Sequence, residues 1–180
     1  MGSPFPQLDC LYYYNQFDMK NRMMSAAFAV ITIGSAWSFT KTPRSAADFT
    51  GNWAINLEKS EHGESSPKAM KLTQTKDSLF IERITNDDKS FVEKISFDGK
   101  TCVTTTTSGR RKSGTAKWNN EGTSFTETAV LGDVPNADKV AFSVVEHWQL
   151  SEDGKQVTVE SEITVVGKGQ FAMKAVYDRQ

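Results

Sequence analysis

The sequence predicts an all-β protein in which an antiparallel, up-and-down meander of eight to ten strands closes into a β-barrel. Apolar and polar residues alternate with a period of two from residue 51 to the end of the chain. Clusters of Gly, Asn, Asp and Ser separate nearly every pair of alternating runs, and no run has the period of a long helix. A meander of this size protects its edge strands best by closing into a barrel.

The alternating runs define the expected strands in order along the chain. The turns between them carry residues that tolerate a positive φ angle, such as Gly99, Gly154 and Gly167. We expect strands at residues 51–57, 68–75, 78–85, 89–97, 101–107, 110–118, 123–131, 140–150, 156–166 and 170–179.

The first expected strand opens with Gly51 and Trp53. A glycine at this place allows the chain to bend tightly into the strand, and Trp53 lies on the same face as Gly51. Because a tryptophan buries a large apolar surface, we expect Trp53 to fill one end of the barrel.

The segment FTGNW at residues 49–53 resembles the Gly-x-Trp signature of the lipocalin and fatty-acid-binding (calycin) superfamily. The segments NLEKS at 56–60 and AVYDRQ at 175–180 look like the corresponding parts of bacterial secreted lipocalin-like domains. The resemblance covers residues 49–180 and implies a lipocalin-like barrel that binds a small molecule.

The resemblance also implies a closed end, since in lipocalins a late arginine packs across the signature tryptophan. Arg179 matches that arginine by position, which implies a closed end of Gly51, Trp53, Tyr177 and Arg179. Two features depart from fatty-acid-binding proteins. Residues 58–67 are too few for their helix-turn-helix lid. Tyr177 precedes Arg179, the reverse of their Arg-x-Tyr carboxylate clamp, so a fatty-acid carboxylate site does not carry over.

Alternation places four charged residues, Arg83, Glu93, Glu127 and Glu146, on faces that otherwise point inward. An unpaired buried carboxylate is costly, so three interpretations are open. A bulge can shift the register and leave these side chains solvated. They can instead form a polar patch inside an apolar cavity. Two of the glutamates can also act as the carboxylate pair of a hydrolase.

The expected ligand cavity combines these charges with apolar walls. Small and large inward residues alternate, so the walls are expected to leave an elongated apolar space. The small ones are Gly114, Ala116, Ala129, Ser161 and Ala175. Trp118 and Trp148 either fill the core or form stacking surfaces for a ligand. The candidate cavity residues are Arg83, Phe91, Glu93, Ala116, Trp118, Phe142, Glu146, Trp148 and Met173.

The composition excludes several functional classes. With 38% hydrophobic and 24% charged residues and a net charge of −1, the chain is typical of one soluble domain with an appendage. The densest basic run, 110–112, is short and is expected to be solvent-exposed beside a hairpin turn. Because the sequence offers no larger basic patch, we expect no nucleic-acid partner. His62 and His147 lack neighbours at metal-ligand spacing, and no nucleotide-binding, phosphate-loop or serine-hydrolase motif occurs. We expect no metal, no cofactor and no catalytic residue.

The N-terminal region has the pattern of a secretory signal peptide. Basic residues after Met19 precede an apolar run of 14 residues, 23–36, that ends in small residues. This run is shorter than the roughly 20 residues of a membrane span, and a retained anchor is the alternative to cleavage after Ala36 or Ser38. The expected organisation is an unstructured upstream segment (1–18), a signal peptide (19–38), a linker (39–48) and a barrel domain (49–180).

The two cysteines fit this organisation. Cys102 lies in an expected strand and is interpreted as a small buried residue rather than a nucleophile, because no His or Asp pattern accompanies it. Cleavage of the leader would remove Cys10 and leave one thiol with no internal disulfide.

Together these features favour a secreted or periplasmic, non-enzymatic binding protein that holds a small hydrophobic molecule in a barrel cavity. A structural or interaction domain whose interior is packed by its own side chains is the alternative. An isomerase or hydrolase on the same scaffold is the third possibility. A cavity above roughly 300 Å³ would favour ligand binding over the interaction domain.

Overall fold

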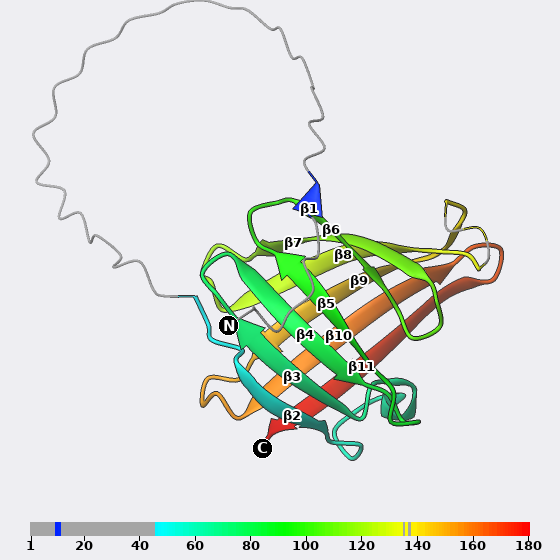
Figure 1. The fold of residues 1–180 in the computed structure, drawn as a ribbon. Helices are drawn as coiled ribbons and strands as arrows, with labels where there is room; N and C mark the ends of the chain where they lie inside the picture. Colours follow the sequence, from blue (N-terminus) through cyan, green and yellow to red (C-terminus); the bar gives the residue numbers. More distant parts are fainter. Residues whose placement is uncertain (1–9, 12–45, 135, 137) are drawn as a thin grey trace, which may run out of the picture.

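A computed structural model describes residues 10–11, 46–134, 136 and 138–180 and consists mainly of one antiparallel sheet (Figure 1). After residue 46, the described chain forms an all-β meander, as predicted. Its strands are β2 (Gly51–Ile55), β3 (Ala69–Gln74), β4 (Ser78–Ile84), β5 (Ser90–Ser96), β6 (Thr101–Thr105), β7 (Arg111–Trp118), β8 (Ser124–Gly132), β9 (Val140–Leu150), β10 (Gln156–Val165) and β11 (Gly169–Arg179). Their ends lie within about two residues of the predicted ones, because alternation and turn residues are local signals.

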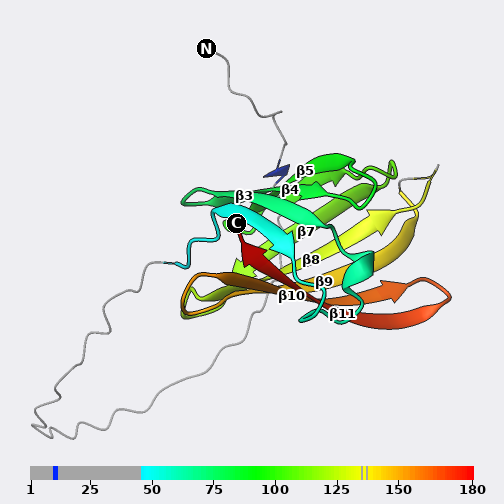
Figure 2. The same cartoon turned by 90° about the horizontal axis from the view of Figure 1, so that it is seen from below.

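The sheet is a nearly closed barrel. Its strand order from β6 to β11 continues through β2 to β5, so the last strand pairs with the first. This leaves β5 and β6 as the two facing edges. They meet at one hydrogen bond, in which the Thr104 hydroxyl on β6 donates to the Val92 carbonyl on β5 at 2.9 Å. Figure 2 shows β3, β4 and β5 on one side of the barrel and β10 and β11 on the other.

A two-residue strand, β1 (Cys10–Leu11), adds to the free edge of β6 with Cys10 opposite Cys102. Cys102 is buried, as expected, and disulfide-bonded. This bond differs from the lone thiol expected for a chain without its leader. The expected signal peptide, 19–38, lies outside the described residues, so its removal stays a prediction.

The closed end of the barrel is built around Trp53, whose side chain is 0% exposed. Its indole Nε1 donates to the Phe49 carbonyl at 3.0 Å, and the Arg179 guanidinium lies 4.3 Å from its ring centroid. A Cβ at Gly51 would lie 2.7 Å from Arg179 Nη1. The glycine therefore leaves the space in which the arginine crosses to the indole, the contact that the resemblance implied.

Aromatic rings fill the layer next to Trp53. Phe125 stacks on Trp148 with ring centroids 5.5 Å apart and planes inclined by 13°. Trp118 lies 4.6 Å from Phe97 and 6.0 Å from Phe49, centroid to centroid. These rings belong to one hydrophobic cluster, here called the closed-end cluster. Trp148 is therefore a core side chain, whereas Trp118 is half-buried and packs against the edge of the cluster.

The connection between β2 and β3 crosses the opposite, open end of the barrel as a short loop. Its one helical turn is the 3₁₀ helix η1 (Gly63–Ser65), so the helix-turn-helix lid is absent from this connection. Glu61 exchanges two backbone hydrogen bonds with Lys174 on β11, which holds the loop against the barrel. No helix in the described part of the chain has the length and apolar character needed to cross a membrane.

Candidate functional site

The barrel interior changes character between its two ends. On β8, Phe125 belongs to the closed-end cluster, whereas Ala129 belongs to a second apolar cluster that also contains Leu131. Glu127 lies between them on the same inward face. On β9, Glu146 lies directly opposite Glu127. Charged side chains therefore separate the two apolar clusters.

Five buried residues form this charged band: Arg83 on β4, Glu93 on β5, Lys112 on β7, Glu127 on β8 and Glu146 on β9. Each is at most 9% exposed. Arg83 donates to Glu93 from Nε and to Glu146 Oε2 from Nη2 at 2.7 Å. Lys112 Nζ lies 2.6 Å from Glu93 Oε2 and 2.9 Å from Glu127 Oε1. Carboxylates and cations alternate from one end of the band to the other. The attraction between neighbours therefore offsets part of the free-energy cost of burying the charges.

The band settles how the inward charges are accommodated. The solvated interpretation is wrong, because Arg83, Glu93, Glu127 and Glu146 are all buried. The one register shift recorded for β8 and β9 lies at Leu131/Gly132, past Glu127, so it leaves their inward direction intact. Among the described residues, no buried side-chain nitrogen or oxygen lacks a hydrogen-bond partner.

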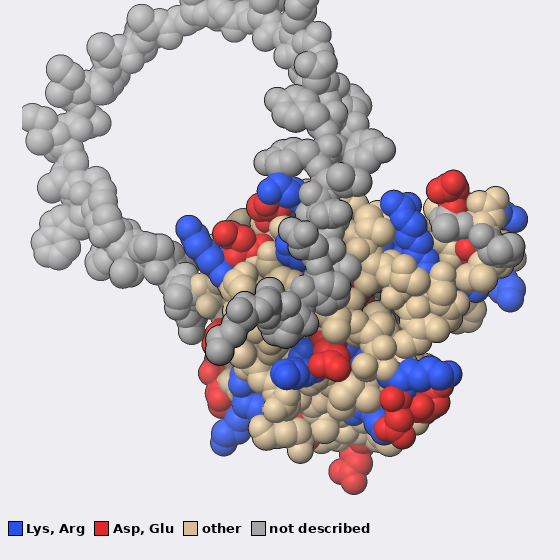
Figure 3. Space-filling model, viewed as in Figure 1, with Lys and Arg blue, Asp and Glu red and all other residues tan. Residues whose placement is uncertain are grey.

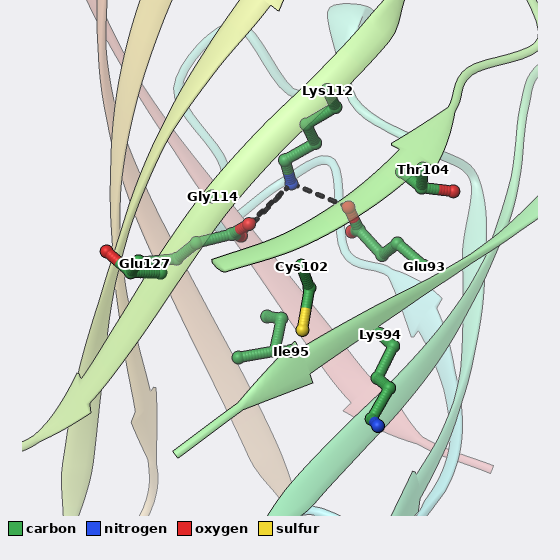
Figure 4. Close-up of a pocket in the computed structure, with 9 residues that line it drawn as sticks. Glu93, Lys94, Ile95, Cys102, Thr104, Lys112, Gly114 and Glu127 are labelled. Atoms are coloured by element: carbon green, nitrogen blue, oxygen red, sulfur yellow. Dashed lines mark hydrogen bonds and ion pairs between the residues drawn. The ribbon is translucent and has the colours of Figure 1, made fainter. Parts of the chain in front are cut away.

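Lys112 was not predicted to take part in the interior. The basic run 110–112 was expected to be solvated, yet Lys112 is 7% exposed and reaches between the carboxylates of Glu93 and Glu127 (Figure 4). It has the same parity on β7 as Gly114, which is the signal that places it inside. Arg111 keeps the expected solvent exposure.

On the face drawn in Figure 3, lysine and arginine side chains are interspersed with acidic ones.

The two ends of the charged band differ in their partners. Glu146 accepts from Arg83 and also from Trp148 Nε1 at 3.0 Å. Within the described part of the chain, Glu127 accepts from Lys112 alone, with distances of 2.9 and 3.1 Å to its two oxygens. A Cβ at Gly114 would lie 3.0 Å from Glu127 Oε1, so this glycine leaves space for the carboxylate.

The pKa values within the band are shifted in opposite directions. Burial raises the pKa of Glu127 to about 7, since Glu93 and Glu146 repel its charge while the attraction comes chiefly from Lys112. Burial also disfavours the charge on Glu93, but Arg83 and Lys112 together lower its pKa to about 2. The pKa of Glu146 is lowered too, because Arg83 and Lys112 outweigh its burial. Glu127 is therefore the carboxyl group that exchanges its proton near neutral pH.

Apolar side chains are partly exposed at the open end. Phe142 and Ile163 pack on the second apolar cluster, and Met173 is half-buried. Phe171 lies opposite Ile163 but is 55% exposed. By alternation, Phe171 shares the parity of Met173 on β11, and Val140 shares that of Phe142 on β9, which places both on the inward face. Both are exposed, since β9, β10 and β11 are the longest strands and run past the packed interior (Figure 1).

The nine candidate cavity residues divide between the levels of the barrel. Ala116, Trp118 and Trp148 belong to or pack against the closed-end cluster. Arg83, Glu93 and Glu146 belong to the charged band. The remaining three, Phe91, Phe142 and Met173, are half-buried. Phe91 lies opposite Arg83 in the register of β4 and β5.

A depression of about 370 Å³ lies where the β2–β3 loop meets β10 and β11. Its wall includes the inward residues Ser161 and Met173. Ser161 is buried and lies opposite Glu146 in the register of β9 and β10. The wall also includes Glu160, Glu162, Ala172 and Lys174, which alternate with Ser161 and Met173 along β10 and β11 and therefore have the opposite parity.

Comparisons with known proteins bear on the fold. No protein-family profile and no curated protein matches the sequence. Solved structures do match, including the zebrafish ileal bile acid-binding protein in complex with cholic acid. The two chains share 14% sequence identity, and the match covers 73% of this chain and 98% of that one with a TM-score of 0.52. The match shows that this chain shares the antiparallel β-barrel fold of that protein. The expected resemblance was to bacterial, secreted domains. That the protein is bacterial and that it is secreted both stay predictions.

Proposed function

We propose that the barrel binds a small, largely apolar molecule through its open end, with the polar group of that molecule against the charged band. The observation that carries this proposal is a contrast within the barrel, where buried charges lie beneath partly exposed apolar side chains at the open end. These side chains, here called the rim, are Phe142, Ile163, Phe171 and Met173. Ligand sites are typically apolar with a few well-placed polar groups. The shared barrel fold adds support, since the similar zebrafish protein was solved with cholic acid.

The residues have separate tasks in this proposal. Phe142, Ile163 and Met173 contact the apolar part of the ligand, and the charged band receives its polar group. Entry is through the depression beside Ser161, because that residue lies between Met173 and Glu146 in the strand register.

Titration with Nile red, a neutral dye that fluoresces in apolar surroundings, tests the proposal. We expect a micromolar dissociation constant, about −8 kcal/mol. Ser161→Phe should block the space next to Met173 and abolish binding, whereas Ser161→Ala, which adds no volume, should retain it. Wild-type protein that fails to bind the dye would instead support a packed interaction domain. Equal binding by both variants would place the dye elsewhere.

We further propose that the protein is exported and loses residues up to Ala36 or Ser38. The basic and apolar segments after Met19 support this proposal. The chain has two cysteines, so cleavage would leave Cys102 as a free thiol in a protein whose uncleaved form has it disulfide-bonded. N-terminal sequencing together with thiol titration of the unfolded mature protein should give a start near residue 37 or 39 and one thiol. A start at Met1 with no thiol would contradict export with cleavage. A start at Met19 would contradict it as well, although that chain also lacks Cys10 and would show one thiol.

A further inference from the structure

The charged band contains an odd number of charges. Two cations, Arg83 and Lys112, face three carboxylates, Glu93, Glu127 and Glu146. With every group ionised, the band carries one excess negative charge. An uncompensated charge is costly to bury. The band is therefore one cation short of neutrality.

The excess charge is concentrated at Glu127. Glu93 accepts from both Arg83 and Lys112, and Glu146 accepts from Arg83 and a tryptophan N–H. Glu127 shares Lys112 with Glu93 and has no second donor among the described residues. Of the three carboxylates, Glu127 is thus the one best able to accept a further hydrogen bond.

A small cavity borders this carboxylate. Its volume is about 10 Å³, and its charged wall residues are Glu93, Glu127, Lys112 and Lys94 (Figure 4). Lys112 is already shared between Glu93 and Glu127. A space of this size is close to that of one water molecule, which is also the size of an ammonium group. Gly114 keeps a face of the carboxylate uncovered, because a Cβ there would lie 3.0 Å from Glu127 Oε1.

The depression at the open end carries charge of the same sign. Three carboxylates line it, from Glu61, Glu160 and Glu162, against the single ammonium of Lys174 and the imidazole of His62. An acidic entrance raises the local concentration of cations and repels anions. This observation is independent of the count inside the barrel, and it points to the same sign of ligand charge.

We propose that the ligand carries a positively charged amine on its apolar part, and that Glu127 pairs with this ammonium group. The inference rests on the proposed function and names the class of ligand for the same site. A bound ammonium would give the band three cations and three carboxylates. A carboxylate ligand would instead raise the excess to two negative charges in a buried setting, which is strongly unfavourable.

The proton equilibrium of Glu127 supplies a second readout. Its carboxyl group faces Lys112 on β7, Glu93 on β5, Glu146 on β9 and Arg83 on β4, and burial raises its pKa to about 7. An ammonium beside Glu127 would lower that pKa. Binding of an amine at pH 7 should therefore release up to about half a proton, whereas binding of a neutral alcohol should release none.

Competition against bound Nile red tests the inference with three compounds that share a 12-carbon tail: dodecylamine, dodecanol and dodecanoate. We expect dodecylamine to displace the dye at a concentration at least about tenfold lower than dodecanoate, equivalent to 1.4 kcal/mol. Glu127→Gln, which keeps the shape of the side chain, should bring dodecylamine within about threefold of dodecanol. Displacement by dodecanol should change far less in this variant than displacement by dodecylamine, because the alcohol carries no charge for Glu127 to pair with.

The outcomes separate the two proposals. Absence of Nile red binding to the wild-type protein would remove the proposed function. Dye binding with displacement by dodecanoate at equal or lower concentration than dodecylamine would overturn only the inference about the amine. Should Glu127→Gln fail to fold, calorimetry of the wild-type protein in two buffers of different ionisation enthalpy decides. Proton release with dodecylamine and none with dodecanol supports the inference, and equal release overturns it.

Discussion

The closed and open ends of the barrel differ in how completely their apolar side chains are buried. At the closed end, Trp53 and Phe125 are 0% exposed and contact other rings or a guanidinium from the same chain. At the open end, Phe171 is 55% exposed, and Phe142 is covered only in part. The first end buries its central rings against the same chain, whereas the second leaves a phenylalanine largely in water.

This difference assigns separate roles to the two regions. The closed end supplies stability, since a tightly packed interior gains both apolar burial and dispersion contacts. In the proposed function, the charged band and the open end provide recognition, because they hold partly exposed apolar surface and a carboxylate, Glu127, whose one donor among the described residues is shared with Glu93. Variants at the closed end should therefore change the free energy of unfolding, and variants at the open end should change ligand binding.

Trp53→Ala should have the largest effect. Removing a fully buried aromatic ring should lower the free energy of unfolding by about 3–5 kcal/mol. Urea unfolding monitored by circular dichroism measures this loss. A change below about 1 kcal/mol would show that the closed end is not the stabilising region.

The charged band should give a pH dependence of intermediate size. The folded protein raises the pKa of Glu127 from 4.5 to about 7, so it holds this proton more tightly than the unfolded chain. Stability should accordingly fall as pH rises from about 4.5 to about 7, by at most about 1.4 kcal/mol per pH unit. Glu93, whose pKa is lowered to about 2, contributes in the opposite direction only below about pH 4.5.

Urea unfolding at pH 5, 6, 7 and 8 measures this slope. Glu127→Gln, which cannot ionise, should flatten it across that range, while Glu160→Gln, a matched change on an exposed carboxylate, should leave it unchanged. A slope that persists in Glu127→Gln would assign the titration to another group.

Arg179→Ala should have a smaller effect. Loss of its contact with the indole should cost about 0.5–1 kcal/mol, the range for an exposed cation–π pair. A double-mutant cycle with Trp53→Ala should give a coupling energy of similar size. Coupling near zero would mean that the stacking contributes nothing to the closed end.

Phe171→Ser should have the smallest effect on stability, within about 0.5 kcal/mol, because the ring is largely solvated. The same change should weaken Nile red binding if the rim contacts the ligand. Leu57→Ser, at an apolar residue that is 60% exposed on the β2–β3 loop, is the control for a general loss of surface hydrophobicity. Equal weakening by both variants would argue against a specific role for the rim.

The strands and the inward charges were predictable from the sequence, whereas the charged band was not. A period of two is a local property, so it gives the face of Arg83, Glu93, Glu127 and Glu146 without knowledge of the partners. Which carboxylate meets which cation depends on barrel closure, because Arg83 on β4 bridges residues on β5 and β9. Pairing across a closed sheet leaves no local pattern.

Lys112 and Phe171 show two further reasons why prediction fell short. Parity alone places Lys112 inside with Gly114, but the charges of its neighbours suggested a solvated run. Parity also places Phe171 on the inward face, yet it gives no information on how far a strand extends beyond the packed interior. Alternation predicts which face of its strand a residue lies on. It does not predict how far along the barrel axis that residue lies, and this position decides whether the side chain is covered.

Native mass spectrometry tests the central claim, that the interior binds an apolar molecule, most directly. Purified protein is incubated with a total lipid extract, repurified and measured without denaturation. We expect a 1:1 adduct on the wild-type protein and on Ser161→Ala, and none on Ser161→Phe. A wild-type protein that carries no adduct, or an adduct that persists on Ser161→Phe, would contradict ligand binding inside the barrel.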